Sequence, residues 1–322
     1  MNSKKTKRKL VTLSRVAIIG CGHVGTTTAY SLLLSNIANE IVLIDKDTNK
    51  LQGEVIDLQH AVPLTRPVKI WAGDFADAAT ADMVVIAAGA GSHPGETRLD
   101  LLGRNIEVIR EIVRQLKAVD FQGVLLMTTN PVDILAQVAQ EESGLPSGQV
   151  IGSGTVLDTA RLRVMLGEEL GVEARSIHAY ILGEHGNSEM AAWSAARVGG
   201  ASIKDFCQSE IPDFDKLLER VRNAAPEIIR HKGYTSFAIA SCVTKICEAI
   251  LRDERTILPV STMTNGQYGI SGVYLSLPCV VGRNGVERIL ELPLNETEKT
   301  GLMASATLLQ KVLSELKATS AK

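Results

Sequence analysis

The chain has 322 residues, of which 45% are hydrophobic and 22% are charged, and its formal net charge at pH 7 is −2. This composition is typical of a soluble globular protein with one large or two medium domains, and it gives no support for a nucleic-acid or membrane partner. The five cysteines contain no Cys-x-x-Cys pair, so we expect free thiols in a reducing cytoplasm.

Residues 1–14 form a basic N-terminal tail, with lysine or arginine at positions 4, 5, 7, 8 and 9. The apolar segment that follows, residues 11–20, is too short to span a membrane and lacks the small-residue site of a signal peptide. We expect a solvated tail. The alternatives are a nucleic-acid contact or an arm that packs on a neighbouring subunit.

A short β-branched run at residues 15–20 predicts a buried strand that leads into Gly20-Cys-Gly22-His-Val-Gly25. A helix is expected at residues 26–34 and a second strand at 40–45, which ends in Asp45. This order is typical of a dinucleotide site, because the glycines let the backbone approach a pyrophosphate at the helix N-terminus. Asp45 would bind the ribose hydroxyls and repel a 2′-phosphate, which favours NAD over NADP; a solvated strand-end acid is the alternative.

The alternation of strands and helices continues through the first half. Strands are expected at 68–72, 83–88 and 124–129, and helices at 100–118 and 132–143. This pattern predicts a Rossmann-type doubly wound parallel sheet, in which ligands bind beyond the carboxyl ends of the strands. The candidate residues that follow such ends are Gly89, Ser92, Arg98 and Asn130.

Residues 89–98 are rich in glycine and polar side chains, which indicates a mobile loop that closes over a bound cofactor. Arg98 is the charge that this loop would carry inward, and an exposed loop arginine is the alternative. The Gly-Ser-Gly-Thr sequence at residues 152–155 marks a break. We therefore expect an NAD-binding domain at 15–153 and an α+β catalytic domain at 154–322.

The second half begins with a helical pattern at residues 156–166 and a strand at 176–182. Two helices should follow at 213–232 and 234–252, the first with a kink or break at Pro226. The remaining elements are strands at 257–262 and 273–281 and a final helix at 296–316.

His185 follows the predicted strand and is a candidate acid and base, because the ordinary pKa of histidine lies near neutrality. Alone, such a histidine is more often a plain polar turn residue. Asp158 and Arg161 are three residues apart and share one helix face, where a surface ion pair is the alternative. Arg163 lies about 200° around the helix from Arg161 and should point away from the site. In an extended chain, His178 would likewise face away from His185.

Taken together, these residues resemble the L-lactate dehydrogenase family within the lactate/malate dehydrogenase superfamily. The likeness runs from about Arg15 to Leu316. Besides the glycine triplet and Asp45, it rests on the sequences Pro94-Gly-Glu-Thr-Arg-Leu-Asp100, Thr129-Asn-Pro-Val-Asp133, Leu157-Asp-Thr-Ala-Arg161, Gly183-Glu-His-Gly186 and Lys232-Gly-Tyr-Thr235.

The resemblance implies a role for each candidate residue. His185 would donate a proton to the substrate carbonyl, Asp158 would favour its protonated imidazole, and Arg161 would bind the substrate carboxylate through two hydrogen bonds. Arg98 would polarise the carbonyl, Asn130 would bond the substrate oxygen from the edge of the sheet, and Thr235 would line the pocket for the small side chain of the substrate. The residues expected to bind NAD are Gly20, Gly22, Val24, Gly25, Asp45, Lys50, Gly89, Ala90, Asn130 and Ser153. No metal is expected.

Ser92 departs from the family pattern, which usually places glutamine here in lactate dehydrogenases and arginine in malate dehydrogenases. Serine lacks the charge that would bind a second carboxylate, so pyruvate and L-lactate are the expected substrates. The alternatives are a broader L-2-hydroxy-acid dehydrogenase of the hydroxyisocaproate type, a malate dehydrogenase, and a non-catalytic NAD-binding protein.

Bacterial relatives that are activated by fructose 1,6-bisphosphate carry an arginine and a histidine at two particular positions. Arg163 and His178 occupy these positions in this chain. The resemblance therefore implies a cytoplasmic homotetramer of glycolysis and fermentation, with a basic effector pocket between subunits. The alternative is a pair of polar interface residues without an effector.

Overall fold

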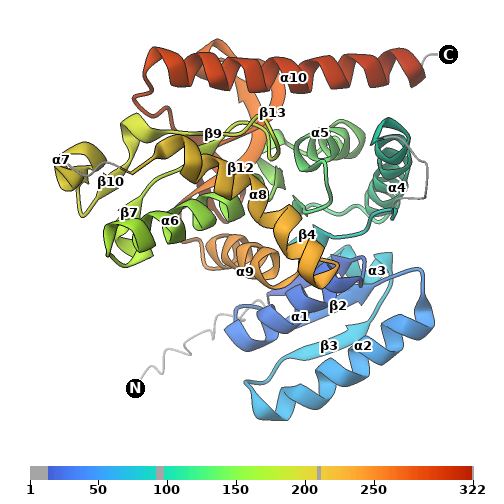
Figure 1. Ribbon diagram of the computed structural model, residues 1–322. Helices are drawn as coiled ribbons and strands as arrows, with labels where there is room; N and C mark the ends of the chain where they lie inside the picture. The colour runs from blue at the N-terminus through green and yellow to red at the C-terminus, as the bar shows by residue number, and fades with distance from the viewer. Residues whose placement is uncertain (1–13, 92–97, 209–211, 321–322) are drawn as a thin grey trace, which may run out of the picture.

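The computed structural model describes residues 14–91, 98–208 and 212–320, so the basic tail lies almost wholly outside the described residues (Figure 1). A nine-stranded sheet forms the centre, in the order β14-β13-β12-β6-β5-β4-β1-β2-β3. Its strands are β1 (Arg15–Ile19), β2 (Glu40–Ile44), β3 (Lys69–Ala72), β4 (Met83–Ile86), β5 (Val124–Met127), β6 (Val150–Gly152), β12 (Thr256–Asn265), β13 (Ser271–Gly282) and β14 (Gly285–Ile289).

The six strands of the first half are parallel and run in the order expected of a Rossmann-type sheet. The strand order reverses between β1 and β4, which places a crevice beyond their carboxyl ends. Strands β4 and β5 are buried at every position. Continuous apolar runs form such strands because helices cover both faces of the sheet. The predicted doubly wound α/β fold is confirmed.

Helices cover the two faces of this sheet in distinct groups (Figure 1). On one face lie α1 (His23–Ser35), α2 (Thr48–Ala61) and α9 (Phe237–Leu251), and on the other α3 (Phe75–Ala78), α4 (Arg98–Ala118), α5 (Val132–Ser143) and α10 (Glu296–Ser320). The remaining helices are α6 (Val156–Leu170), α7 (Ile203–Cys207) and α8 (Phe214–Lys232). Helices α1 and α9 lie side by side although they come from different halves of the chain.

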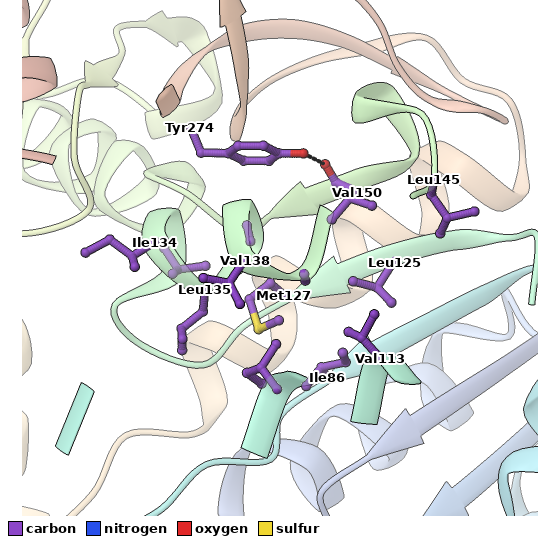
Figure 2. Close-up of a cluster of buried hydrophobic side chains, with 14 of the residues drawn as sticks. Ile86, Val113, Leu125, Met127, Ile134, Leu135, Val138, Leu145, Val150 and Tyr274 are labelled. Atoms are coloured by element: carbon purple, nitrogen blue, oxygen red, sulfur yellow. Dashed lines mark hydrogen bonds between the residues drawn. The ribbon is translucent and has the colours of Figure 1, made fainter. Parts of the chain in front are cut away.

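The core follows from the alternation of side chains along each strand. In β5, Leu125 and Met127 face the α4 and α5 side, whereas Val124 and Leu126 face the α1 side. Figure 2 shows Leu125 and Met127 among the side chains of α5, with Tyr274 of β13 above them. A strand of the second half thus helps to close the core of the first.

The second half extends the sheet with antiparallel strands, so the sheet as a whole is mixed rather than purely parallel. Strands β12 and β13 form a long hairpin, and β12 joins β6 through the pair Ser261 and Gly152. The sheet is therefore continuous across the two halves of the chain. Strands β6 and β14 and helices α2, α3 and α7 were not predicted from the sequence.

The single strand expected at residues 176–182 is wrong. It is divided into β7 (Ile177–His178), which pairs with β10 (Arg197–Val198), and β8 (Ile181–Leu182), which pairs with β9 (Met190–Ala191). The segment passes from one small sheet to another, and β11 (Ala201–Ser202) completes the first of them.

The break expected at Pro226 is also wrong, because α8 is one continuous helix through this residue. Pro226 is exposed, so water can bind the carbonyl group that the proline leaves without its intrahelical partner. None of the helices in the described parts of the chain combines the length and apolar character needed to cross a membrane.

Candidate active site

His185 lies in the turn that connects β8 to β9. Gly183 begins this turn with φ +98°, and a Cβ at this position would lie 2.8 Å from Oγ of Ser305, so glycine is required here. The Ser305 hydroxyl also accepts a hydrogen bond of 2.8 Å from the backbone N–H of Glu184. The turn is therefore fixed against α10, and the position of His185 is fixed with it.

Asp158 of α6 is bonded to both His185 and Arg161. Its Oδ2 lies 2.6 Å from Nδ1 of His185, and its Oδ1 accepts a hydrogen bond of 2.7 Å from Arg161. The side chain of Asp158 is only 3% exposed. The three residues predicted to form the centre of the site are thus brought together.

The charges of this group shift the pKa values of its members. Burial alone would raise the pKa of Asp158, but the cations of His185 and Arg161 hold it below its ordinary value. Burial alone would lower the pKa of His185, but the Asp158 carboxylate, with help from Asp133 and Glu189, raises it to about 9. His185 is therefore protonated at neutral pH and can act as an acid.

Asp133, in the first turn of α5, holds the backbone of the catalytic turn. Its Oδ2 accepts a hydrogen bond of 2.8 Å from the backbone N–H of His185, and its Oδ1 accepts one of 2.5 Å from the Ser261 hydroxyl of β12. Burial raises the pKa of Asp133 to about 6. Asp133 is the last residue of the Thr129–Asp133 motif, but the sequence predicted no role for it or for Ser261.

Glu189 is a second carboxyl group that the sequence analysis missed. The residue is 2% exposed, and one of its carboxyl oxygens lies within 4.8 Å of ligand atoms of Asp158 and His185. Burial, followed by the nearby charge of Asp158, raises the pKa of Glu189 to about 8. In the sequence it looks like any acid in a surface turn, so only its buried position identifies it.

The glycine-rich loop has the shape that a dinucleotide requires. A Cβ on Gly20 would lie 2.4 Å from the backbone nitrogen of Ala88, and one on Gly25 would lie 1.9 Å from the carbonyl oxygen of Gly20. A Cβ on Gly22 would meet nothing within 4 Å, and α1 begins there without a side-chain cap. The N–H groups of the first turn are thus left for an anion such as a pyrophosphate.

Asp45 lies directly after β2, beside this loop. Its carboxylate accepts hydrogen bonds from the backbone N–H groups of Cys21, at 2.6 Å, and Asp47, at 2.9 Å. A carboxylate has about four acceptor positions, so Asp45 retains capacity for ribose hydroxyls. The residues present fit an NAD molecule.

The other predicted nucleotide residues lie along the same edge of the sheet. Gly89 and Ala90 follow β4, where the N–H of Ala90 donates to Asn105 Oδ1 at 2.7 Å. Ser153 follows β6 and is buried, whereas Lys50 is exposed in α2. Val24 lies in the first turn of α1.

The remaining substrate residues are placed less fully. Asn130 is exposed after β5, and Thr235 is half-buried between α8 and α9; neither takes part in the hydrogen bonds around His185 that are described above. Arg98 is the first residue of α4, but its side chain is not described. Ser92 lies outside the described residues, as does most of the predicted mobile loop.

Arg163 and His178 lie apart from the Asp158 group. Nε of Arg163 donates a hydrogen bond of 3.1 Å to the carbonyl of Ala179, and its guanidinium lies over the Tyr180 ring. His178 is exposed on β7. Arg161 and Arg163 therefore bind different partners, in agreement with their predicted positions around the helix.

Two family descriptions together cover nearly the whole chain. Residues 14–152 match the lactate/malate dehydrogenase NAD binding domain, and residues 155–320 match the lactate/malate dehydrogenase alpha/beta C-terminal domain.

Individual proteins show the same likeness. The L-lactate dehydrogenase of Acetivibrio thermocellus is 47% identical over 321 residues, which are 98% of this chain and 99% of the relative. That of Priestia megaterium is 48% identical over 300 residues, or 92% and 94% of the two chains. Among solved structures, MGS-M5, a lactate dehydrogenase enzyme from a Medee basin deep-sea metagenome library, has a TM-score of 0.93 at 42% identity, covering 95% of this chain and 99% of its own.

Proposed function

The chain belongs to the lactate/malate dehydrogenase family, and we propose that within it the protein is an NAD-dependent L-lactate dehydrogenase that interconverts pyruvate and L-lactate. The observation that carries the proposal is the group of Asp158, His185 and Arg161. It combines a proton donor with a cation for a carboxylate, and a 2-oxo acid presents both a carbonyl and a carboxylate. The L-lactate dehydrogenases among the relatives support the choice of substrate.

The chain's own residues bind the substrate and move the proton. Arg161 uses one N–H for Asp158, which leaves the others of its guanidinium to bind the substrate carboxylate. Because an ionised carboxylate can only accept, Nδ1 of His185 carries the proton that Asp158 binds, and Nε2 is left to serve the carbonyl oxygen. When bound, NADH supplies the hydride.

The proton balance follows from these positions. In pyruvate reduction, the carbonyl carbon receives the hydride with its electron pair, and Nε2 of His185 gives its proton to the oxygen. The imidazole is then neutral, while Asp158 remains ionised because its pKa is low. In lactate oxidation, Nε2 takes the hydroxyl proton back. The Arg98 side chain, at the start of α4, would stabilise negative charge on the oxygen, and Asn130 and Thr235 would complete the pocket.

The test is NADH oxidation with pyruvate, 2-oxobutyrate and oxaloacetate, in the wild type and in His185→Asn. We expect pyruvate to be the best substrate and oxaloacetate a poor one, since Ser92 offers no charge to its second carboxylate. His185→Asn should lower turnover by ~100-fold or more while NADH binding stays nearly unchanged.

His60→Asn is the matched control, because His60 is an exposed histidine of α2, and it should keep wild-type turnover. Near-normal turnover in His185→Asn would contradict the assignment. A preference for oxaloacetate would point to a malate dehydrogenase, and equal rates with pyruvate and 2-oxobutyrate to a broader 2-hydroxy-acid dehydrogenase.

We also propose that the protein is a cytoplasmic homotetramer with an effector site for fructose 1,6-bisphosphate at Arg163 and His178. In support, Arg163 bonds to the backbone of the residue after His178, and His178 is exposed. All five cysteines are free, which fits a reducing compartment.

A further inference from the structure

Glu189 is a buried carboxyl group that the proposed mechanism does not use. It lies just before β9, four residues after His185, and is 2% exposed. Its backbone is fixed at both ends, since its N–H donates to Gly186 at 3.2 Å and its carbonyl accepts from Arg222 of α8. Yet, among the residues that the structure describes, its Oε1 has no hydrogen-bond partner. A buried carboxyl oxygen without a partner is costly, so its retention calls for a physical reason.

The groups that face Glu189 are those of the proposed active site. Asp158 and Arg161 approach from α6, His185 from the same turn, and Arg222 from α8. Asp133 of α5 also acts on His185, whose backbone N–H it binds. Burial raises the pKa of Glu189 to about 8, whereas a protonated His185, together with Arg222 and Arg161, favours its ionised form. When His185 is neutral, the adjacent Asp158 carboxylate favours a protonated Glu189.

The same three side chains have the spacing of a metal site, but their bonds favour a proton over a metal ion. Asp158, His185 and Glu189 bring ligand atoms within 4.8 Å of one another. However, one oxygen of Asp158 is held by Arg161, and the other is bonded to Nδ1 of His185. A metal ion would have to displace these charge-assisted bonds, whereas a proton on Glu189 leaves them intact.

We propose that Glu189 is a positioning residue for proton transfer, and that its negative charge keeps His185 protonated at a higher pH than Asp158 alone would. This inference rests on the proposed function, in which His185 is the acid. As the pH rises, Glu189 loses its proton first, because its pKa is about 8 and that of His185 is about 9. The two groups then titrate as a coupled pair, and the protein keeps its acid into the alkaline range.

The first test is the pH profile of kcat/KM for pyruvate in Glu189→Gln, which keeps the size of the side chain but cannot ionise. The midpoint at which kcat/KM falls at high pH should drop by about one pH unit. A shift of this size is consistent with removing a unit charge that lies within 4.8 Å of His185. Glu189→Asp keeps the acid and should restore most of the profile. An unchanged midpoint in Glu189→Gln would overturn the proposal.

Glu298→Gln is the matched control, because Glu298 is 7% exposed but binds the backbone N–H groups of Ser194 and Asn295 instead of facing His185. Its profile should match that of the wild type. If it moves as far as that of Glu189→Gln, the effect is general to buried glutamates and the proposal fails.

The second test needs no activity, so it separates this inference from the proposed function. The titration of His185 is followed by NMR with labelled histidine, and His185→Asn identifies its signal among the six histidines. The midpoint should fall in Glu189→Gln even if pyruvate is not the substrate. If Glu189→Gln does not fold, the wild type can be titrated instead by NMR with labelled glutamate. One glutamate carboxyl group should then titrate near pH 8, and a spectrum without such a group would overturn the proposal.

Discussion

At the scale of single residues, the site depends on one carboxylate that serves two cations. Asp158 is 2% exposed and would be costly to bury alone, but Arg161 and His185 each neutralise part of its charge. The same bonds fix which nitrogen of the imidazole is free to give up its proton. In the proposed mechanism, a single side chain therefore aligns the group that binds the substrate carboxylate with the group that transfers the proton.

Asp158→Asn should separate these effects. His185 has a folded-state pKa of about 9, above its ordinary 6.5, so its protonated form is present below that pH and is lost as the pH rises through it. Without the Asp158 charge, the high-pH limb of pyruvate reduction should move towards 6.5, and turnover at pH 7.5 should fall by at least ~100-fold.

The measurement for Asp158→Asn is kcat/KM against pH, together with an NADH titration, which should change little. Glu168→Gln removes an exposed carboxylate from the same helix and should leave the profile in place. If kcat/KM of Asp158→Asn still falls only near pH 9, the Asp158 carboxylate is not what raises the pKa of His185.

The residues of this site that could be predicted are those that lie in short sequence motifs. His185, Asp158 and Arg161 lie in recognisable motifs, and the helical spacing of Asp158 and Arg161 placed them together. Ser261 could not be found in this way, because its role depends on a hydrogen bond to a residue 128 positions away. The role of Glu189 depends likewise on how its turn folds against α6 and α8.

At the scale of elements, short apolar runs predicted five of the six parallel strands of the first half, and four of these, β1, β2, β4 and β5, are almost wholly buried. Strand β6 was missed, because its three residues are too few to show a pattern. The segment at residues 176–182 was predicted less well, because its two short strands pair with different partners, which no periodicity reveals. Strand β14 was missed for a related reason: its residues Gly285–Ile289 are mostly exposed or half-buried and form only the edge of the sheet.

Tyr274 shows how β13 supports the strand order of the first half. The side chain is fully buried, and its hydroxyl donates to the carbonyl of Val150 at 3.0 Å and approaches that of Ser147 at 3.3 Å (Figure 2). Tyr274→Phe removes the hydroxyl, so the buried carbonyl of Val150 loses this hydrogen bond. The free energy of unfolding, measured with urea, should fall by about 1–3 kcal/mol.

Tyr30→Phe is the control for Tyr274→Phe, since Tyr30 is 48% exposed and its change should stay within about 0.5 kcal/mol. Equal stability of the two variants would mean that the Tyr274 hydroxyl contributes nothing to the junction of β6 and β13.

At the scale of the whole molecule, the proposed active site lies where the two halves of the sheet meet. Asp133 comes from the first half, and it binds the backbone of His185 and the hydroxyl of Ser261 from the second. A shift of one half relative to the other would therefore disturb the turn that holds His185. A ligand that fixes the second half can in this way alter the affinity of the site for its substrate.

Adding fructose 1,6-bisphosphate tests whether the proposed effector site at Arg163 and His178 is coupled to the proposed active site. Arg163 is half-buried, and this burial lowers the pKa of its guanidinium, so an anion bound there would stabilise its charge. Helix α6 carries both Arg163 and Arg161, so a ligand at Arg163 acts on the element that holds the carboxylate-binding arginine. We expect the sugar bisphosphate to lower the KM for pyruvate, raise the thermal midpoint and favour the tetramer in analytical ultracentrifugation.

Arg163→Gln and His178→Asn should each reduce the ratio of activities with and without the sugar bisphosphate, because each removes a partner of its phosphates. Arg175→Gln is the matched control, because the Arg175 side chain is 91% exposed and lies three residues before His178. It tests whether the loss of any nearby positive charge reduces activation by the sugar bisphosphate. Inorganic phosphate at the same ionic strength controls for salt. If the wild type shows no change in KM, thermal midpoint or assembly, Arg163 and His178 serve no effector, and the basic pair is only a polar part of the surface.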